Sequence, residues 1–136
     1  MSTPREVAEK FFGFMANGDF VQAFGMLRDD APYRVIGNTP LSGVYNGPAD
    51  LMAKLGPALS ELKDLRVTLA ELIVEGNRAV ALMRGTAQAP HGPYVQDPAI
   101  FIVTIDGEKI AGLLEMVDTV MIETRCFGKQ LVDPAA

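Results

Sequence analysis

The chain has 136 residues with a formal net charge of −5, and hydrophobic residues make up 49% of it against 21% charged residues. This length is enough for one compact core, and this composition excludes disordered and fibrous proteins. The net negative charge, without a cluster of Lys or Arg residues, argues against nucleic acid as a partner. No apolar run is long enough to span a bilayer and no secretory signal opens the chain, so we expect a cytoplasmic protein with no membrane partner.

The first helices are predicted from the signals at their ends. Thr3-Pro4-Arg5-Glu6 combines a capping hydroxyl, a proline suited to the first helical position and a glutamate three residues after the cap, which is a capping-box pattern. Apolar residues at helical spacing follow, and Asn17-Gly18 ends this helix. Asp19 is then placed to cap a second, short helix that continues to Leu27.

A short hairpin and a third helix come next. Residues 33–36 read as a strand and residues 44–45 as a second extended piece, with turn-forming residues between them. Leucines and a methionine at helical spacing then predict a helix over residues 48–62. Gly56-Pro57 lies inside this helix, and we expect the proline to kink or interrupt it.

The remainder of the sequence predicts an antiparallel meander. Four long segments are rich in β-branched and aliphatic residues and are joined by turn-forming residues, among them the two-residue turn Gly76-Asn77. These segments are 65–75, 78–89, 94–105 and 109–127. We assign residues 1–130 to a single domain and residues 131–136 to a flexible tail.

The order of these elements resembles that of the nuclear transport factor 2-like superfamily, in its SnoaL-like and ketosteroid isomerase-like branch. Segments 94–101, 105–110 and 115–119 carry the most specific similarity, because their aromatic residues, Asp-Gly turn and Glu-x-x-Asp-Thr ending look like the pattern of SnoaL-like proteins. The resemblance implies an α+β, cone-shaped domain in which three N-terminal helices pack on a strongly curved, mainly antiparallel sheet. It also implies a mostly apolar pocket for a hydrophobic small-molecule ligand.

Two carboxylates of the last hairpin form our preferred catalytic centre. Both possible registers of this hairpin place Asp97 and Asp118 on one face, either directly opposed or as diagonal neighbours, in an otherwise apolar row that includes Phe101. A close carboxylate pair in apolar surroundings raises the pKa of at least one member, which suits a general base or acid. The alternative is that both lie near strand ends, where they cap amides or face water. Glu115 lies on the opposite face from Asp118, so only one of these two is expected to enter the pocket.

A second pair of charged residues allows two interpretations. Counting back from the Gly76-Asn77 turn places Glu71 and Arg84 on one face of an apolar hairpin, within reach of a charge-assisted contact. They form a structural ion pair or mark a dimer face, or else Arg84 orients a carboxylate or polarises the substrate. The resemblance to limonene epoxide hydrolases implies the second role, although Thr86 stands where that family's Arg-x-Asp pattern has aspartate.

Tyrosines supply the remaining polar candidates. Their phenolic protons can be donated to a developing oxyanion, and Asn38 can position substrate or water, although packing with an exposed hydroxyl is the commoner use of such a tyrosine. The candidate catalytic residues are therefore Asp97, Asp118, Arg84 and Tyr33. The candidate substrate-binding residues are Glu71, Asn38, Tyr45, Tyr94, Glu115 and Phe101.

The sequence gives no ligand set for a metal ion. Cys126 and His91 are the single cysteine and the single histidine, so an internal disulfide and a zinc site built from several Cys or His residues are excluded. We predict no metal and no cofactor. The function that fits best is a cofactor-independent enzyme, of isomerase, cyclase, dehydratase or lyase type, acting on a hydrophobic cyclic or aromatic molecule by carboxylate acid/base catalysis. The alternatives are a non-catalytic binding protein, an epoxide hydrolase-like enzyme, and a dimerisation module with a vestigial pocket.

Quaternary structure is predicted from the last two strands of the meander. Apolar residues occupy both of their faces, and only one face can cover the core. The other face would form an exposed apolar patch, which marks a partner surface. We therefore expect a homodimer.

Overall fold

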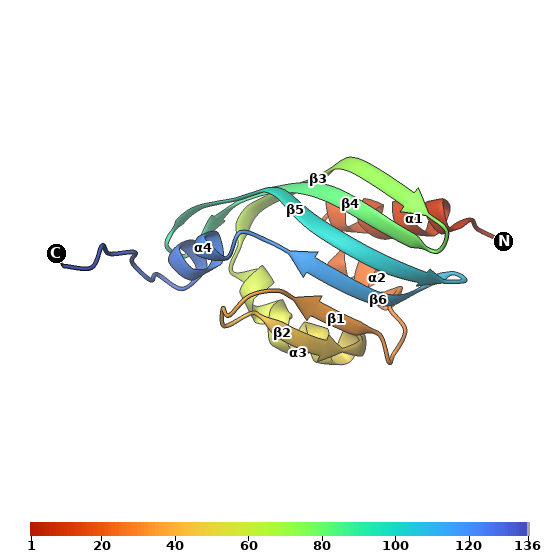
Figure 1. The fold of residues 1–136 in the computed structure, drawn as a ribbon, viewed down its shortest axis with the longest axis horizontal. Helices are drawn as coiled ribbons and strands as arrows, with labels where there is room; N and C mark the ends of the chain where they lie inside the picture. The colour runs from red at the N-terminus through yellow and green to blue at the C-terminus, as the bar shows by residue number, and fades with distance from the viewer. Residues whose placement is uncertain (136) are drawn as a thin grey trace.

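The computed structural model describes residues 1–135 and shows an α+β domain (Figure 1). The helices are α1 (Pro4–Ala16), α2 (Phe20–Gly25), α3 (Gly47–Ser60), the short α4 (Thr119–Met121) and the π-helix η1 (Ile122–Cys126). The strands are β1 (Pro32–Val35), β2 (Gly43–Asn46), β3 (Lys63–Glu75), β4 (Arg78–Ala89), β5 (Gly92–Asp106) and β6 (Lys109–Met116). No helix within residues 1–135 is both long enough and apolar enough to cross a membrane.

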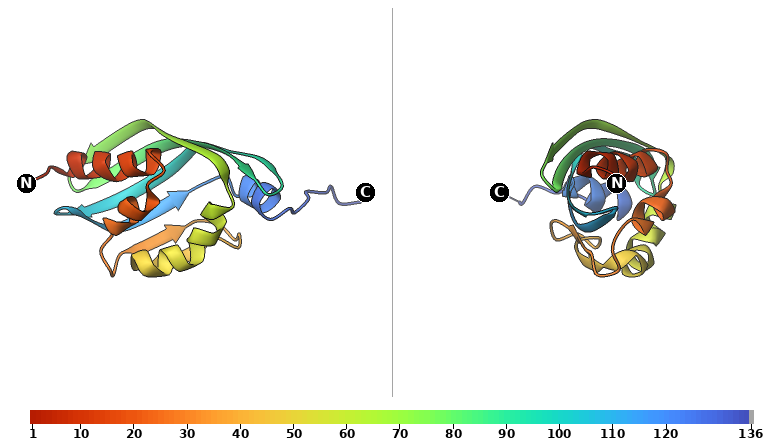
Figure 2. Two further views of the ribbon diagram at one scale, coloured as in Figure 1. Left: turned by 180° about the vertical axis from the view of Figure 1, so that it is seen from behind. Right: turned by 90° about the vertical axis from the view of Figure 1, so that its right-hand side faces the viewer.

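The six strands form one curved sheet in the order β2-β1-β6-β5-β4-β3. Neighbouring strands are antiparallel except β1 and β6, which are parallel and pair Tyr33 with Leu113 and Val35 with Glu115. Helices α1, α2 and α3 lie on the concave side of the sheet (Figure 2). The buried core, including Phe11, Phe12, Tyr33, Leu51 and Val103, fills the space between these helices and the sheet. The predicted fold class is confirmed.

The helix ends follow from local hydrogen bonds that the sequence predicted. The Thr3 hydroxyl accepts from the Glu6 amide at 3.2 Å and the Glu6 carboxylate accepts from the Thr3 amide at 3.1 Å, which completes the capping box. Asp19 accepts from the Gln22 amide at 3.1 Å at the start of α2. Of the two expected effects of Pro57, a kink or an interruption, the interruption is wrong, because α3 runs through this residue. Pro57 lies within the last four residues, where one missing amide donor removes little of the helix.

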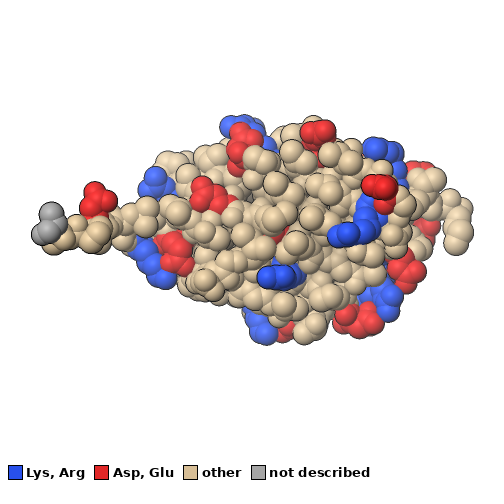
Figure 3. Space-filling model, viewed as in Figure 1, with Lys and Arg blue, Asp and Glu red and all other residues tan. Residues whose placement is uncertain are grey.

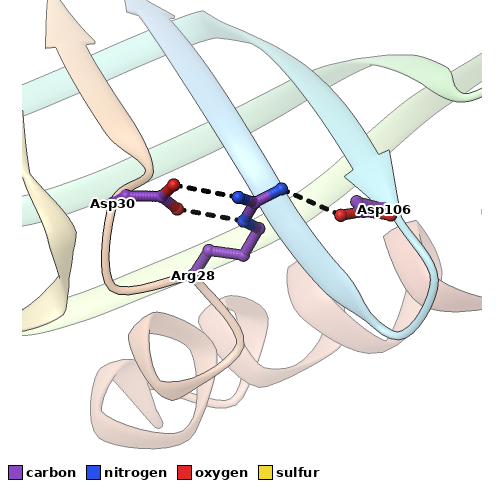
Figure 4. A network of polar contacts seen from close by, with 3 residues as sticks. All are labelled: Arg28, Asp30 and Asp106. Carbon is purple, nitrogen blue, oxygen red and sulfur yellow. Dashed lines mark hydrogen bonds and ion pairs between the residues drawn. The ribbon is translucent and has the colours of Figure 1, made fainter.

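Arg28 joins two turns that lie far apart in the sequence. It follows α2, and its guanidinium donates to both carboxylate oxygens of Asp30 at 2.9 Å and to Asp106 at 2.9 Å (Figure 4). Its backbone amide also donates to the Ile110 carbonyl at 2.9 Å. Because Asp106 ends β5 and Ile110 lies in β6, these bonds tie the α2–β1 connection to the last hairpin.

The last strand is shorter than the sequence predicted. β6 ends at Met116, whereas the run of β-branched residues predicted a strand through residue 127. The Asp118 carboxylate accepts from the amides of Val120 and Met121 at 3.0 and 3.3 Å, so it starts α4 instead of continuing the strand. Residues 129–135 follow η1 without regular secondary structure and extend away from the domain (Figure 1). Residue 136 of the expected tail lies outside the described residues.

A β-bulge near the start of β6 decides which residues of this strand face inward. Ile105 pairs with Ile110, but Thr104 pairs with Gly112, so Ala111 is the extra residue. A one-residue slip of this kind moves every later side chain to the other face of the sheet. Phe101 is consequently opposite Glu115, and both face the concave side.

Candidate functional site

A cavity of about 140 Å³ lies between the concave face of the sheet and the three N-terminal helices. Its walls are mostly apolar, with contributions from Phe24, Leu55, Val67, Met83 and Phe101. Five residues bring polar or ionisable side-chain groups to the lining, namely Tyr33, Tyr94, Gln96, Glu115 and Cys126. An apolar cavity of about 150 Å³ accommodates benzene, so this one matches a ligand with a single ring.

Glu115 is the acidic residue of the cavity wall. The pairing of β6 with both β1 and β5 holds its backbone in the middle of the sheet. The Tyr33 hydroxyl donates to its Oε1 at 2.7 Å. Burial raises the pKa of Glu115, and the Tyr33 hydrogen bond opposes that rise only in part. The site therefore holds a carboxyl group poised to exchange a proton closer to neutral pH than an ordinary glutamate does.

Tyr33 supports this carboxyl from the neighbouring strand. Its side chain is 1% exposed. Burial raises the pKa of Tyr33 well above its ordinary value, and the negative charge of Glu115 raises it further. The phenol thus stays protonated and remains a hydrogen-bond donor to Glu115 over the pH range of interest.

A second polar group is formed by Tyr94 and Gln96, which lie two residues apart on the same face of β5. Gln96 is 4% exposed, and its Nε2 donates to the Tyr94 hydroxyl and to the Asp118 carbonyl, both at 3.0 Å. Its Oε1 accepts from the Asp118 amide at 2.7 Å. Burial raises the pKa of Tyr94, while the Gln96 hydrogen bond lowers it to a smaller extent. The Tyr94 phenol is accordingly neutral at physiological pH.

The predicted catalytic pair is not brought together in the cavity. Asp97 lies on the convex side with an exposed side chain, and Asp118 lies beyond the end of β6, where it caps α4. The predicted placement is wrong because two irregularities were not counted. A register shift between Ala99 and Gln96 turns Asp97 outward in β5, and the bulge at Ala111 exchanges the inner and outer positions along β6. The alternative describes the structure better, since Asp118 caps amides just beyond a strand end and Asp97 faces water, although Asp97 lies within β5 and not at its end. Glu115 is the acidic residue that enters the cavity.

The predicted contact between Glu71 and Arg84 is also wrong. Arg84 Nε donates to Asp97 Oδ2 at 3.1 Å, and Glu71 is exposed on β3. Ala70 is an extra residue in β3, so the residues before it and Glu71 after it do not share a face as predicted. Leu65 and Val67 consequently face inward and line the cavity, whereas Glu71 faces outward. The Arg84–Asp97 side chains are more than half exposed, and such surface pairs contribute at most about 1 kcal/mol. Neither Arg84 nor Glu71 lies on the cavity wall.

The remaining candidates divide between the cavity and its surroundings. Tyr33, Tyr94 and Phe101 line the cavity, as their predicted substrate contacts require. The Tyr45 side chain is buried, but its hydroxyl donates to the Leu41 carbonyl and it lies outside the lining. Asn38 is exposed in the loop after β1 and does not reach the cavity.

Among the lining residues with polar or ionisable groups, sequence reasoning missed Gln96 and Cys126. Gln96 could have been found from its spacing, because a residue two positions after Tyr94 in a strand shares its face. Cys126 entered the sequence analysis only as the single cysteine, and it lies half-buried in η1 against the cavity, where burial raises the pKa of its thiol. Within residues 1–135, no three His, Cys, Asp or Glu side chains are grouped closely enough to hold a metal ion.

Solved structures share the fold over nearly the whole chain. An NTF2-like protein from Burkholderia xenovorans LB400 has 23% identity and a TM-score of 0.70, covering 92% of this chain and 98% of its own. An NTF2-like protein from Burkholderia thailandensis E264 has 15% identity and a TM-score of 0.81 with the same coverage. TerC, co-crystallised with polyporic acid, has 18% identity and a TM-score of 0.76, covering 91% of this chain and 98% of its own.

The sequence itself shows which family the chain belongs to. No curated protein matches the sequence. The model of the SnoaL-like domain matches residues 8–113, from α1 to the inward-facing part of β6. This match spans most of the chain and includes most of the residues that line the cavity, and it ends before Glu115, Val117, Ile122 and Cys126. The chain therefore belongs to the SnoaL-like domain family, within the nuclear transport factor 2-like fold.

Proposed function

We propose that this protein binds a small apolar ring compound in its cavity and catalyses proton transfer on it with the Glu115 carboxyl group. The single observation that carries the proposal is a carboxyl group placed in an apolar cavity and held there by the Tyr33 hydroxyl at 2.7 Å. A buried carboxyl has a raised pKa, and a pKa near the working pH makes a group effective both as a base and as an acid.

The geometry of Glu115 suits this role. Tyr33 holds Oε1, and among residues 1–135 no hydrogen-bond donor contacts Oε2. Oε2 is therefore the oxygen that can take a proton from a bound molecule and return it at another atom. The net reaction needs no oxidant and no cofactor, so an isomerase, lyase or cyclase activity fits this site.

The comparisons support a small-molecule ligand for a protein of this fold. TerC shares the fold and was crystallised with an organic acid, although an identity of 18% relates only the folds. An epoxide hydrolase-like reaction is less well supported, because the Arg84–Asp97 pair that would supply an arginine and an aspartate lies on the opposite side of the sheet. A non-catalytic binding protein would use the same cavity, and turnover by the Glu115 variant described in the Discussion separates the two.

Filling the cavity should abolish binding without unfolding the protein. Gly85 lines the cavity, and a Cβ added there meets no atom within 4 Å. A Gly85→Leu variant should therefore place its side chain in the ligand space and weaken the binding of single-ring compounds by about tenfold or more. The measurement is ligand-detected NMR or calorimetry with a panel of such compounds.

Gly13→Val is the matched control for this experiment. A Cβ at Gly13 also meets no atom within 4 Å, and Gly13 does not line the cavity. This variant should bind the panel as the wild type does. If Gly85→Leu also binds normally while both variants melt cooperatively, the ligand does not enter this cavity.

We also propose that two copies associate through the convex face of the sheet. No helix covers this face (Figures 1 and 2), and charged side chains are sparse over it (Figure 3). Its centre contains two apolar rows across three strands, formed by Val80, Ile102 and Leu114 and by Leu82, Ile100 and Met116. Contiguous apolar surface of this kind is expected to be covered by a second apolar surface.

The proposed dimer predicts a mass of about twice that of the chain in light scattering at micromolar concentration. Ile102→Lys would place a charge in the centre of the interface and should give a monomer. Thr104→Lys, two residues further along the same face, is the control and should leave most of the dimer intact. A monomeric wild-type protein would contradict the proposal.

A further inference from the structure

The orientation of the Gln96 side-chain amide is determined by the backbone of Asp118. The Asp118 amide can only donate and its carbonyl can only accept. The Gln96 atom that faces the amide at 2.7 Å must therefore be the oxygen, and the atom that faces the carbonyl at 3.0 Å must be the nitrogen. This settles the choice between the two amide orientations by chemistry, without reference to the position of any hydrogen atom.

The consequence for Tyr94 follows from the second proton of the same nitrogen. Gln96 Nε2 lies 3.0 Å from the Tyr94 hydroxyl, so Tyr94 is the acceptor in this hydrogen bond. The phenolic proton of Tyr94 must then point elsewhere, and among residues 1–135 no acceptor receives it. Tyr94 lines the cavity, so an acceptor on a molecule bound there can receive this proton.

The other two tyrosines already use their protons inside the protein. Tyr33 donates to Glu115 at 2.7 Å, and Tyr45 donates to the Leu41 carbonyl. The chain contains three tyrosines, so Tyr94 is the phenol whose donor remains available to a ligand. The Tyr94 hydroxyl accepts from Gln96, so only its donor is unused, and a ligand that supplies an acceptor for this donor gains one hydrogen bond.

We infer that Tyr94 recognises an acceptor oxygen on the ligand and that Gln96 is the positioning residue that directs the Tyr94 proton into the cavity. This inference rests on the proposed function and narrows its ligand class. The ligand is an apolar ring compound with a carbonyl or another acceptor oxygen near Tyr94 and with the reacting atoms near Glu115. A hydrocarbon of the same shape leaves the Tyr94 donor without a partner, so the site discriminates against it.

Acetophenone and α-methylstyrene form a suitable pair of probes. They share one ring and nearly the same shape, and they differ in having a carbonyl oxygen or a methylene group at the same position. Wild-type protein should bind acetophenone about three- to tenfold more tightly than α-methylstyrene, which corresponds to one net hydrogen bond. Tyr94→Phe should remove this preference and leave the affinity for α-methylstyrene unchanged or slightly higher.

Infrared spectroscopy of bound acetophenone tests the role of Gln96. In the wild type, the carbonyl stretch should shift to lower frequency than in an apolar solvent, and in Tyr94→Phe the shift should disappear. Gln96→Glu keeps an acceptor for the Asp118 amide but has no proton to spare for Tyr94, which is then free to donate to the new carboxyl group. The carbonyl shift should therefore shrink in this variant as well, an effect that a merely structural role for Gln96 would not produce.

The outcomes separate the inference from the proposed function. If both probes bind the wild type equally and Tyr94→Phe changes neither, the inference is overturned while a ligand site in the cavity remains. If neither probe binds the wild type, or if Gly85→Leu binds them as well as the wild type does, the proposed function fails and the inference fails with it. An unchanged carbonyl shift in folded Gln96→Glu would overturn the positioning role alone. If Gln96→Glu does not fold, the Tyr94→Phe result still shows whether Tyr94 donates the hydrogen bond to the ligand.

Discussion

Replacing Glu115 with Gln should reduce turnover by about 10²- to 10⁴-fold, the usual contribution of a general acid or base. The amide has the same size as the carboxyl group, and its oxygen can still accept from Tyr33, so the cavity and the fold are retained. What is lost is the group that takes up and returns the proton. The measurement is product formation, or exchange of the ligand's acidic hydrogens for deuterium when no net product is known.

The same substitution should make the protein more stable at neutral pH. Burial raises the pKa of Glu115 in the folded state, so between the unfolded and folded pKa values the folded protein binds more protons than the unfolded chain. The stability is fully present below the unfolded pKa and is lost as the pH rises through the folded pKa, by about 1.4 kcal/mol for each unit of difference. Glu115→Gln removes this loss because the amide does not ionise.

Melting curves from pH 4 to pH 8 check the sign of this effect. The difference in stability between Glu115→Gln and the wild type should favour the variant increasingly as the pH rises. Glu75→Gln, at the exposed end of β3, is the control and should show no such trend. A variant that loses stability at pH 8, or that retains full turnover, would show that Glu115 is a structural residue and would favour the reading as a binding protein without catalysis.

Gly47→Ala should be the most destabilising single change that adds only one methyl group. Gly47 starts α3 with φ of +80°, a conformation that L residues rarely adopt. An added Cβ would lie 2.2 Å from the backbone carbonyl oxygen of Asp29, so the chain before β1 and the start of α3 would have to move apart. We expect a loss of at least about 3 kcal/mol in the free energy of unfolding.

Gly18→Ala separates the clash from the backbone strain. Gly18 has a similar φ of +75°, but a Cβ there meets no atom within 4 Å. This variant should lose about 1–2 kcal/mol, the cost of a left-handed conformation alone. Denaturant unfolding of both proteins gives the comparison. Equal losses would mean that the contact with Asp29 relaxes easily and does not fix the position of α3, the helix that supplies Leu55 to the cavity wall.

The fold could be predicted because most of its signals are local. Thr3, Asp19 and the Gly76-Asn77 turn act within a few residues of themselves, and the structure shows the helix starts and the hairpin at these places. The end of β6 was missed because Asp118 is a capping residue surrounded by residues with a preference for strands. A single sequence gives both signals, and the two hydrogen bonds between the Gln96 side chain and the Asp118 backbone, which depend on the fold, favour the cap.

The candidate site could be predicted only in part. The kinds of residue were right, since a carboxyl group and tyrosines do line an apolar cavity, and Tyr33, Tyr94, Glu115 and Phe101 are among them. The choice between Glu115 and Asp118 depended on which alternate residues of β6 face the cavity. The bulge at Ala111 decides this, and an alanine carries no sequence signal for a bulge. Bulges of this kind arise where a curved sheet must bend, which is a property of the whole sheet and not of the residue.

The parallel pairing of β1 with β6 has a consequence for the order in which the protein assembles. Strands β3 to β6 pair with their neighbours along the chain, whereas β1 meets a strand that lies far from it in the sequence, and Tyr33 reaches Glu115 across 82 positions. Contacts that close long loops form late, because the chain loses the entropy of loop closure before the contacts between distant residues stabilise it. During synthesis on a ribosome, β1 cannot pair with β6 until β6 has been synthesised. We therefore expect the meander to form before the amino-terminal strands dock on its open edge, so that the ligand cavity is completed last.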